Sequence, residues 1–406
     1  MTVAKYIFAI FVLSLSYYTS VLAYNNFKTD PEEHMNASQL ITSKGYPCEE
    51  YTVRTHDGFL LGVQRIPHGR NHSKTMATKP VVFLQHGLLC SSTNWLTNLA
   101  NESFAYILAD AGFDVWLGNV RGNTYSRKHV TLKPDQDEFW AWSWDEMAWY
   151  DMPAMINFAL NVSKQQQLYY IGHSQGTLMA FAQLSRDPEL AKKIKTMFAM
   201  GPVATAGHVT SPIRYLAALA PEIQLLFDIF GVKDFLPNSD IVKWLADHVC
   251  TEQSRIFCEN ILFILSGWDQ QQLNVTRLPV YFTHVPAGTS VRNVVHFAQM
   301  VESNKFQMYD YGTPEENKNY YNQSTPPLYY GENITTPIAL YWGDNDWLAD
   351  PTDVKNFIPK IKKVMIVNDE IQEFDHLDFI WAMDAPQRVY RNIIQTIMKQ
   401  EISIHG

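Results

Sequence analysis

Short apolar runs recur along the chain and alternate with stretches in which apolar residues have helical spacing. Six of these runs have the length and composition of buried strands: residues 80–87, 112–118, 167–171, 194–200, 338–342 and 363–367. Continuous apolar strands that are separated by helices are typical of a parallel sheet covered on both faces. The pattern therefore predicts an α/β fold with a mostly parallel sheet.

The alternation of strand-like and helical stretches stops between residues 201 and about 331. In this segment the sequence is helical and loop-rich and contains many prolines. We expect this segment to be an insertion between two core strands. Residues 24–203 and 332–406 would then form the core, and residues 204–331 would form a cap and lid.

The most apolar stretch of this insertion has helical spacing from Leu216 to Phe230, and Pro221 is expected to divide it into two helices. A second apolar patch covers residues 261–265. These helices either pack on the core or form a movable lid whose apolar face meets lipid.

The first 23 residues have the features of a secretory signal peptide. Lys5 precedes an apolar run from Tyr6 to Leu15, and Val21-Leu22-Ala23 offers a small-residue cleavage site. An uncleaved membrane anchor is the alternative, but the run is short for a bilayer span, and no later stretch approaches about 20 apolar residues. The sequence predicts a secreted protein or, alternatively, one in the lysosome lumen.

Glycosylation signals agree with passage through the secretory pathway. Each has Ser or Thr two positions after the asparagine and no intervening proline. The predicted acceptors are Asn36, Asn71, Asn101, Asn161, Asn274, Asn322 and Asn333.

Composition and charge further limit the class of protein to which this chain can belong. With 406 residues, 46% of them hydrophobic, the chain can bury a large core. The net charge of −9 and the lack of a long basic run argue against nucleic-acid binding.

The four cysteines can pair in three ways. We favour Cys250 with Cys258, which closes the smallest loop; four thiols are the alternative.

Residues 172–176 read Gly-His-Ser-Gln-Gly, the G-x-S-x-G pattern of a nucleophile elbow, between a predicted strand and a helical stretch at 177–184. A serine on such a sharp turn has strained backbone angles, so its neighbours must lack bulky side chains. Gly172 and Gly176 meet that requirement. Ser174 is therefore the candidate nucleophile.

A serine hydroxyl needs a base, and the base needs an orienting carboxylate; in this type of fold they follow the serine in the order acid, then histidine. His376 is the histidine that follows a late strand in a plausible loop. The loop after residue 342 offers three aspartates. We prefer Asp346, which lies past the tightest part of the turn, over Asp344, and expect Asp350 to cap the next helix.

Acyl transfer also needs hydrogen-bond donors for the oxyanion. The backbone N–H of Gln175, next to the nucleophile, is one candidate. The second is the N–H of Leu88 in the loop after the first buried strand. His86 and His173 lie beside turn glycines, and we expect them to hold loops by hydrogen bonds rather than act as bases.

With these motifs in place, the sequence resembles the acid lipase family, the group that contains gastric lipase and lysosomal acid lipase. The similarity extends from about Asn36 to Lys399. Its landmarks are residues 45–51, 86–95, 116–123, 145–147, 172–176, 286–290, 348–351 and 376–380.

The resemblance implies an α/β-hydrolase fold with a helical cap, and hydrolysis of triacylglycerols or sterol esters at mildly acidic pH without a metal or cofactor. It implies Ser174 as nucleophile, Asp346 as orienting carboxylate and His376 as general base. It also places the oxyanion donors on Leu88 and Gln175, and a cap disulfide on Cys250 and Cys258.

Three positions depart from the family pattern. A third cap cysteine is common near the position of Ser266, a glycine at that of Asp344, and an asparagine at that of Asp375. Two added carboxylates near the triad are expected to stabilise a positive imidazole at His376.

The leading hypothesis is a serine lipase that acts on neutral lipid at a lipid–water interface. Two alternatives remain: a catalytically silent lipid-binding protein on the same fold, and an esterase for short, soluble acyl chains. The intact catalytic set argues against the first, and the apolar cap argues against the second.

Overall fold

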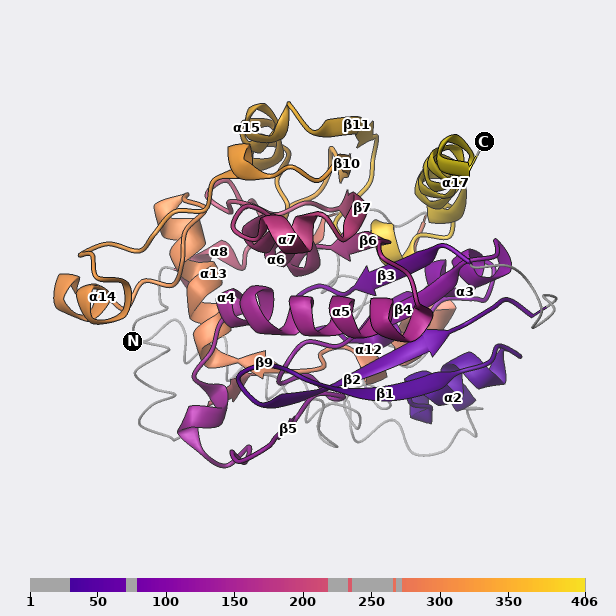
Figure 1. Cartoon of the computed structure of the whole chain (residues 1–406), viewed down its shortest axis with the longest axis horizontal. Helices are drawn as coiled ribbons and strands as arrows, with labels where there is room; N and C mark the ends of the chain where they lie inside the picture. Colours follow the sequence, from indigo (N-terminus) through magenta and orange to yellow (C-terminus); the bar gives the residue numbers. More distant parts are fainter. Residues whose placement is uncertain (1–29, 71–78, 218–232, 236–265, 268–271, 406) are drawn as a thin grey trace, which may run out of the picture.

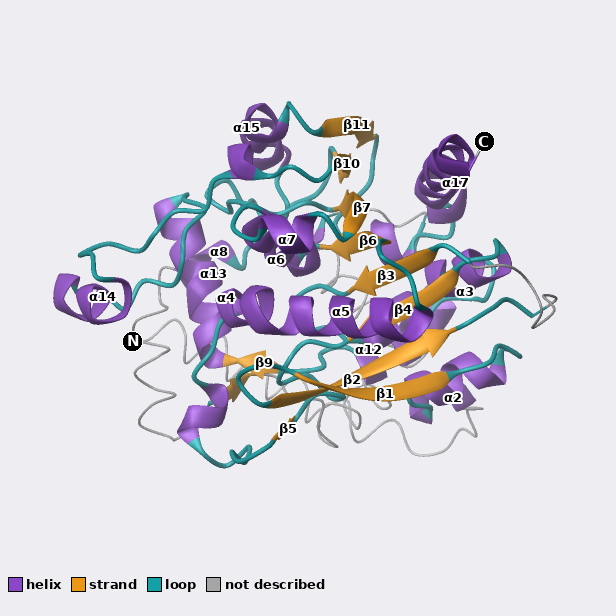
Figure 2. Cartoon of the chain, viewed as in Figure 1, coloured by secondary structure: helices purple, strands orange, loops and turns teal. Residues whose placement is uncertain are grey.

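The computed structural model describes residues 30–70, 79–217, 233–235, 266–267 and 272–405. Its centre is a nine-stranded sheet with the order β1-β2-β4-β3-β6-β7-β10-β11, in which β5 pairs with β2 (Figure 2). The strands are β1 Glu49–Arg54, β2 Phe59–Ile66, β3 Val81–Gln85, β4 Asp114–Gly118, β5 Lys128–His129, β6 Leu168–His173, β7 Ile194–Met200, β10 Ile338–Gly343 and β11 Met365–Ile371.

All six apolar runs form strands, so this part of the prediction is confirmed. They are β3, β4, β6, β7, β10 and β11, and they pair with one another in parallel. Strands β1 and β2 were not predicted; they pair antiparallel with each other, and β2 pairs antiparallel with β4. Their burial is uneven along the strand, so they lack the continuous apolar run by which the others were found.

Each face of the sheet buries its own hydrophobic cluster. Along β3, Val81 and Phe83 join one cluster while Val82 and Leu84 join the other, because successive strand side chains point to opposite faces. The first cluster includes residues of α5 (Met152–Ser163), α6 (Gln175–Leu184) and α15 (Pro351–Ile361). The second includes residues of α2 (Ala37–Ser43), α3 (Phe104–Asp110), α12 (Leu278–His284), α16 (Asp378–Trp381) and α17 (Arg391–His405). Figure 1 shows α5 running across the strands on the first of these faces.

The part of residues 204–331 that the structure describes contributes no strand to the large sheet. It contains α8 (Arg214–Ala217), α13 (Val291–Ser303) and α14 (Pro314–Tyr321). It also contains a separate two-stranded sheet, in which β8 (Asp234–Phe235) pairs antiparallel with β9 (Thr289–Ser290). Helix α14 projects from the body of the molecule (Figure 1).

Several predicted features lie outside the described residues: the signal peptide at 1–23, most of the apolar stretch from Leu216 to Phe230, the patch at 261–265, Asn71, and the pair Cys250 and Cys258. The other two cysteines, Cys48 and Cys90, are free thiols. Where the chain is described, no helix is both long and apolar enough to span a bilayer.

Five of the predicted glycan acceptors are exposed: Asn36, Asn101, Asn161, Asn322 and Asn333. Asn274 is half-buried, and its Oδ1 accepts hydrogen bonds from the backbone N–H and the hydroxyl of Thr276. The exposed acceptors are therefore accessible in the folded chain.

Candidate active site

Ser174 occupies the junction between β6 and α6. Its backbone has φ 54° and ψ −120°, a conformation that is strained for any residue with a side chain. Two hydrogen bonds hold the turn: Ser174 N donates to Met200 O at 3.1 Å, and Thr177 Oγ1 donates to Ser174 O at 2.7 Å. The strand, the sharp turn and the helix together form the elbow that the G-x-S-x-G pattern predicted.

The two glycines of the motif permit close backbone contacts. A Cβ atom on Gly176 would lie 2.5 Å from Gln85 O, and one on Gly172 would lie 2.8 Å from the carbonyl carbon of Gly176. Both distances are too short for any side chain. The start of α6 therefore packs directly against the end of β3, which brings the loop after β3 to the elbow.

His376 and Asp346 are in direct contact. Nδ1 of His376 lies 2.8 Å from Oδ2 of Asp346, and their side chains are only 4% and 0% exposed. The other carboxylate oxygen of Asp346 accepts the backbone N–H groups of Leu348 and Ala349, at 2.9 and 2.7 Å. Asp346 lies in the loop after β10 and His376 in the loop after β11, which are neighbouring parallel strands.

The neighbouring aspartates have different surroundings. Asp350 is the N-cap of α15 and accepts the N–H of Thr352 at 2.8 Å, as predicted. Asp344 is exposed, and its Oδ1 accepts the N–H of Glu373. Of the three candidates in this loop, Asp346 is the one that contacts the imidazole of His376.

The loop that carries His376 packs against the elbow. His173, the residue before the serine, donates from Nε2 to the carbonyl oxygen of His376 at 2.9 Å, and the two rings are 4.9 Å apart. A Cβ on Gly201 would lie 3.2 Å from His376 Nδ1 and 3.5 Å from Asp346 Oδ2. Gly201 directly follows Met200, which accepts the N–H of Ser174, so the serine, histidine and aspartate gather at the same edge of the sheet.

The described residues include no hydrogen bond between the Ser174 hydroxyl and His376. Such bonds are often long in unliganded enzymes and shorten only when substrate is bound.

Two backbone N–H groups belong to segments next to the serine, the 86–88 loop and the start of α6. A Cβ on Gly87 would lie 3.0 Å from the Cβ of Ser174, which places the 86–88 loop against Ser174. The Leu88 N–H follows in this loop, and the Gln175 N–H opens α6, where the helix dipole favours negative charge. Neither N–H donates to another described residue, so both can bind an oxyanion.

His86 and His173 hold loops in the way that the sequence predicted. His86 Nδ1 donates to Gly87 O at 2.8 Å, and its Nε2 accepts from Val120 N and Asn123 Nδ2. Burial lowers the pKa of His86 to about 4 and lowers the pKa of His173 well below its ordinary value. Both rings are therefore neutral, and each has at least one nitrogen committed to a neighbouring loop.

Asp375, which precedes His376, is almost completely buried. Its Oδ1 accepts the N–H groups of Leu377 and Asp378, and its Oδ2 lies 3.3 Å from the Ser266 hydroxyl. Burial raises the pKa of Asp375 to about 7, with a further contribution from the nearby Asp346 charge. At mildly acidic pH the Asp375 side chain is mostly neutral and adds little negative charge beside His376.

Two further contacts at the site were not predicted from the sequence. Gly201 has a positive φ of 54° and makes room for the imidazole of His376. The side chain of Gln175 is buried, and its Oε1 accepts a hydrogen bond from Asn293 Nδ2 at 2.8 Å. A lone glycine after a strand and an asparagine in a distant helix carry no local signature of such roles.

No group of three or more His, Cys, Asp or Glu side chains within the described ranges is placed to hold a metal ion. A serine on a strained turn, a histidine paired with a carboxylate, and two backbone N–H groups without another acceptor are groups that suit acyl transfer.

Two family models match the chain. One, described as a partial alpha/beta-hydrolase lipase region, matches residues 37–99. The other, described as the alpha/beta hydrolase fold, matches residues 80–381 and thus most of the chain. The fold predicted from the sequence is confirmed by this match and by the observed sheet.

Two similar proteins with assigned names are lipases. Lysosomal acid lipase/cholesteryl ester hydrolase from Homo sapiens is 52% identical over 373 residues, which cover 92% of this chain and 93% of that protein. Gastric triacylglycerol lipase from Rattus norvegicus is 51% identical over 366 residues, which cover 90% of this chain and 92% of that protein.

Among solved structures, a soluble variant of monoglyceride lipase from Saccharomyces cerevisiae matches with a TM-score of 0.54 and 15% identity, over 88% of this chain and 97% of that one. At this level of identity the match shows the fold alone.

Proposed function

The chain belongs to the acid lipases of the alpha/beta hydrolase fold family, and we propose that it is a serine lipase that hydrolyses the ester bonds of neutral lipids through an acyl-enzyme. The observation that carries the proposal is the buried pair of His376 and Asp346 beside a serine on a strained elbow. The substrate class follows from the relatives, whose names describe triacylglycerol and cholesteryl ester hydrolysis.

The first half of the reaction forms the acyl-enzyme. Ser174 Oγ attacks the ester carbonyl while His376 Nε2 takes its proton, and Asp346 stabilises the resulting imidazolium through Nδ1. The carbonyl oxygen gains negative charge and receives hydrogen bonds from the Leu88 and Gln175 N–H groups. His376 then gives the proton to the leaving alcohol, and the acyl group stays on Ser174.

The second half repeats the chemistry with water. His376 removes a proton from the water, hydroxide attacks the acyl-enzyme, and the same two N–H groups stabilise the second tetrahedral intermediate. His376 returns the proton to Ser174 Oγ as the fatty acid leaves. The cycle consumes one water and leaves the protein unchanged.

We further propose that the mature protein works in the lumen of the secretory pathway, either secreted or retained in lysosomes. The exposed sequons support this location, because glycosylation requires acceptor asparagines on the surface of a chain that enters the endoplasmic reticulum. The amount of the protein in culture medium compared with lysosomes would distinguish the two destinations, and a mobility shift on glycosidase treatment would test glycosylation.

The central test compares the parent protein with Ser174→Ala on triolein and cholesteryl oleate. The parent should turn over at least one of them, and Ser174→Ala should retain no measurable turnover; turnover equal to the parent would exclude Ser174 as the nucleophile. Labelling by a fluorophosphonate probe should occur in the parent and not in the variant. An unlabelled parent would instead indicate a silent lipid-binding protein.

A substrate series separates a lipase from an esterase for soluble substrates. Rates with triglycerides of increasing chain length should rise when the substrate passes its solubility limit. Rates that stay flat or fall at that point would favour the short-chain esterase.

A further inference from the structure

Both polar atoms of the Gln175 side-chain amide have contacts inside the protein. Its Oε1 accepts from Asn293 Nδ2 at 2.8 Å, and its Nε2 lies 3.4 Å from the sulfur of Met147. Gln175 is also the residue whose backbone N–H is proposed above to bind the oxyanion. Because the side chain and this N–H belong to the first residue of α6, fixing one restricts rotation of the other.

Asn293 is itself fixed from several directions. Its backbone N–H donates to the hydroxyl of the N-cap residue Ser290 at 3.0 Å, and its Nδ2 also donates to Thr289 Oγ1 at 3.0 Å. The Ser290 hydroxyl in turn donates to the carbonyl of Trp142 at 2.6 Å. The amide of Asn293 therefore has little freedom to turn away from Gln175.

The Oδ1 atom of Asn293 is buried and has no hydrogen-bond partner among the described residues. Leaving a buried acceptor unpaired is unfavourable, because the acceptor loses its hydrogen bonds to water. The Asn293 amide group provides a pair of donors, one of which reaches Gln175.

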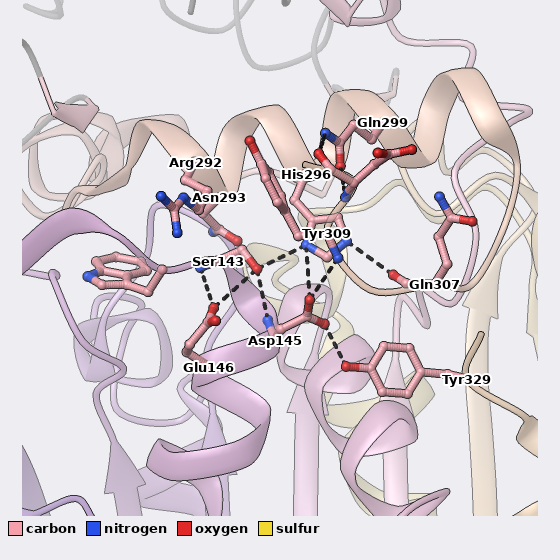
Figure 3. A network of polar contacts seen from close by, with 12 residues as sticks. Ser143, Asp145, Glu146, Arg292, Asn293, His296, Gln299, Gln307, Tyr309 and Tyr329 are labelled. Atoms are coloured by element: carbon pink, nitrogen blue, oxygen red, sulfur yellow. Dashed lines mark hydrogen bonds and ion pairs between the residues drawn. The ribbon is translucent and has the colours of Figure 1, made fainter. Parts of the chain in front are cut away.

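Helix α13, which carries Asn293, is held in place one turn further along by the contacts of His296. Figure 3 shows Asp145 beside His296, Tyr309 and Tyr329, with Asn293 on the same helix as His296. His296 Nε2 donates to Gln307 O at 3.1 Å, and its Nδ1 accepts from the Ser143 hydroxyl at 3.0 Å.

Asp145 completes this anchor through its two carboxylate oxygens. One accepts the Tyr309 N–H at 2.8 Å and the other the Tyr329 hydroxyl at 2.6 Å. Burial lowers the pKa of His296 to about 3, so its ring stays neutral and keeps its two hydrogen bonds at mildly acidic pH. The start of α13 is consequently a rigid support for Asn293.

We propose that Asn293 is a positioning residue for the oxyanion site, which acts by holding the Gln175 side chain and thereby the direction of the Gln175 N–H. The proposal rests on the proposed function, because it assigns an oxyanion to that N–H. A misdirected donor weakens stabilisation of the tetrahedral intermediate more than binding of the ground-state ester, so kcat should fall while KM changes little.

The test uses Asn293→Leu, which keeps the size of the side chain and removes its donors. With an ester that the parent hydrolyses, kcat should fall about tenfold or more, short of the roughly 100- to 1,000-fold loss caused by removing a whole oxyanion donor, and KM should stay within about twofold. Affinity for a long-chain trifluoromethyl ketone, which forms a tetrahedral adduct with an anionic oxygen, should fall in parallel with kcat/KM. Unchanged kcat and inhibitor affinity would overturn the proposal.

Gln175→Met tests the same contact from the other side and carries the test if Asn293→Leu does not fold. The double variant should lose no more than the worse single variant, because both changes remove one contact. Losses that multiply would show that the two side chains act independently.

Asn317→Leu is the matched control, a buried asparagine of α14 whose amide contacts Asp310 and Tyr311 instead. It should lower the melting temperature without changing kcat or inhibitor affinity. A failed proposed function has a different signature: either Ser174→Ala retains the turnover of the parent, or the parent itself shows neither turnover nor labelling, whatever Asn293→Leu does.

Discussion

Nδ1 of His376 lies 2.8 Å from Oδ2 of Asp346, and the second oxygen of that carboxylate is committed to two backbone N–H groups. The carboxylate is thus fixed by its own loop before it meets the imidazole. An acceptor at this position keeps the proton of neutral His376 on Nδ1, which leaves Nε2 free to take the serine proton.

Asp346→Asn should lower kcat by about four orders of magnitude with little effect on folding, because an amide can donate to Nδ1 and select the wrong tautomer. Kinetics on a soluble ester at the pH optimum measures the loss. Asp344→Asn is the control from the same loop, and its exposed side chain predicts parent-like kcat. Equal losses in the two variants would contradict the assigned role of Asp346.

Asp375→Asn should change how stability depends on pH. Asp375 in the unfolded chain loses its proton near pH 3.8, whereas in the folded protein it keeps the proton to about pH 7. Between these values the native state binds more protons, so this group makes the protein less stable as pH rises. The melting temperature of Asp375→Asn relative to the parent should therefore rise from pH 4 to pH 7 and level off above it.

Melting curves at unit pH intervals from 4 to 8 make this measurement. Asp344→Asn, with its exposed carboxylate, should show a difference from the parent that does not vary across that range. A flat difference for Asp375→Asn as well would mean that the buried carboxyl titrates normally.

The pH–rate profile tests whether Asp344 and Asp375 stabilise protonated His376. If they do, Asp344→Gly combined with Asp375→Asn should move the acid limb of kcat/KM to lower pH; an unmoved limb would reject that expectation. Because Asp375 is mostly neutral below pH 7, Asp375→Asn alone should leave the acid limb in place. Any shift in the double variant would then come from Asp344.

Arg121 joins two acidic residues in the interior. It donates to Asp151 at 2.7 and 2.9 Å and to Asp57 at 2.6 and 3.0 Å, and both Arg121 and Asp151 are fully buried. Arg121→Met would leave both carboxylates without a positively charged partner and should destabilise the protein by about 3–5 kcal/mol in urea unfolding. Lys192→Met breaks an exposed pair with Glu189 and should change stability by under about 1 kcal/mol. Similar effects for the two variants would show that burial does not govern the strength of these pairs.

The sequence alone determined the features that depend on residues close together along the chain. Five of the six parallel strands were predictable because a strand that is buried on both faces must be apolar at successive positions. The sixth, β11, lies at the edge of the sheet with alternate residues exposed, and it was found from the short apolar run at its start. The elbow at Ser174 was predictable because close backbone contacts require glycine at 172 and 176. The helix cap at Asp350 depends only on the residues that follow it.

Tertiary structure alone decided which distant groups meet. Asp344 and Asp346 are two residues apart, and only the path of the loop after β10 directs one towards His376 and the other to the N–H of Glu373. Asn293 and Gln175 are 118 positions apart, and packing of α13 against the elbow brings them together. Local sequence constrains backbone angles over a few residues, whereas these contacts follow from how the strands and helices pack, and no short pattern encodes that.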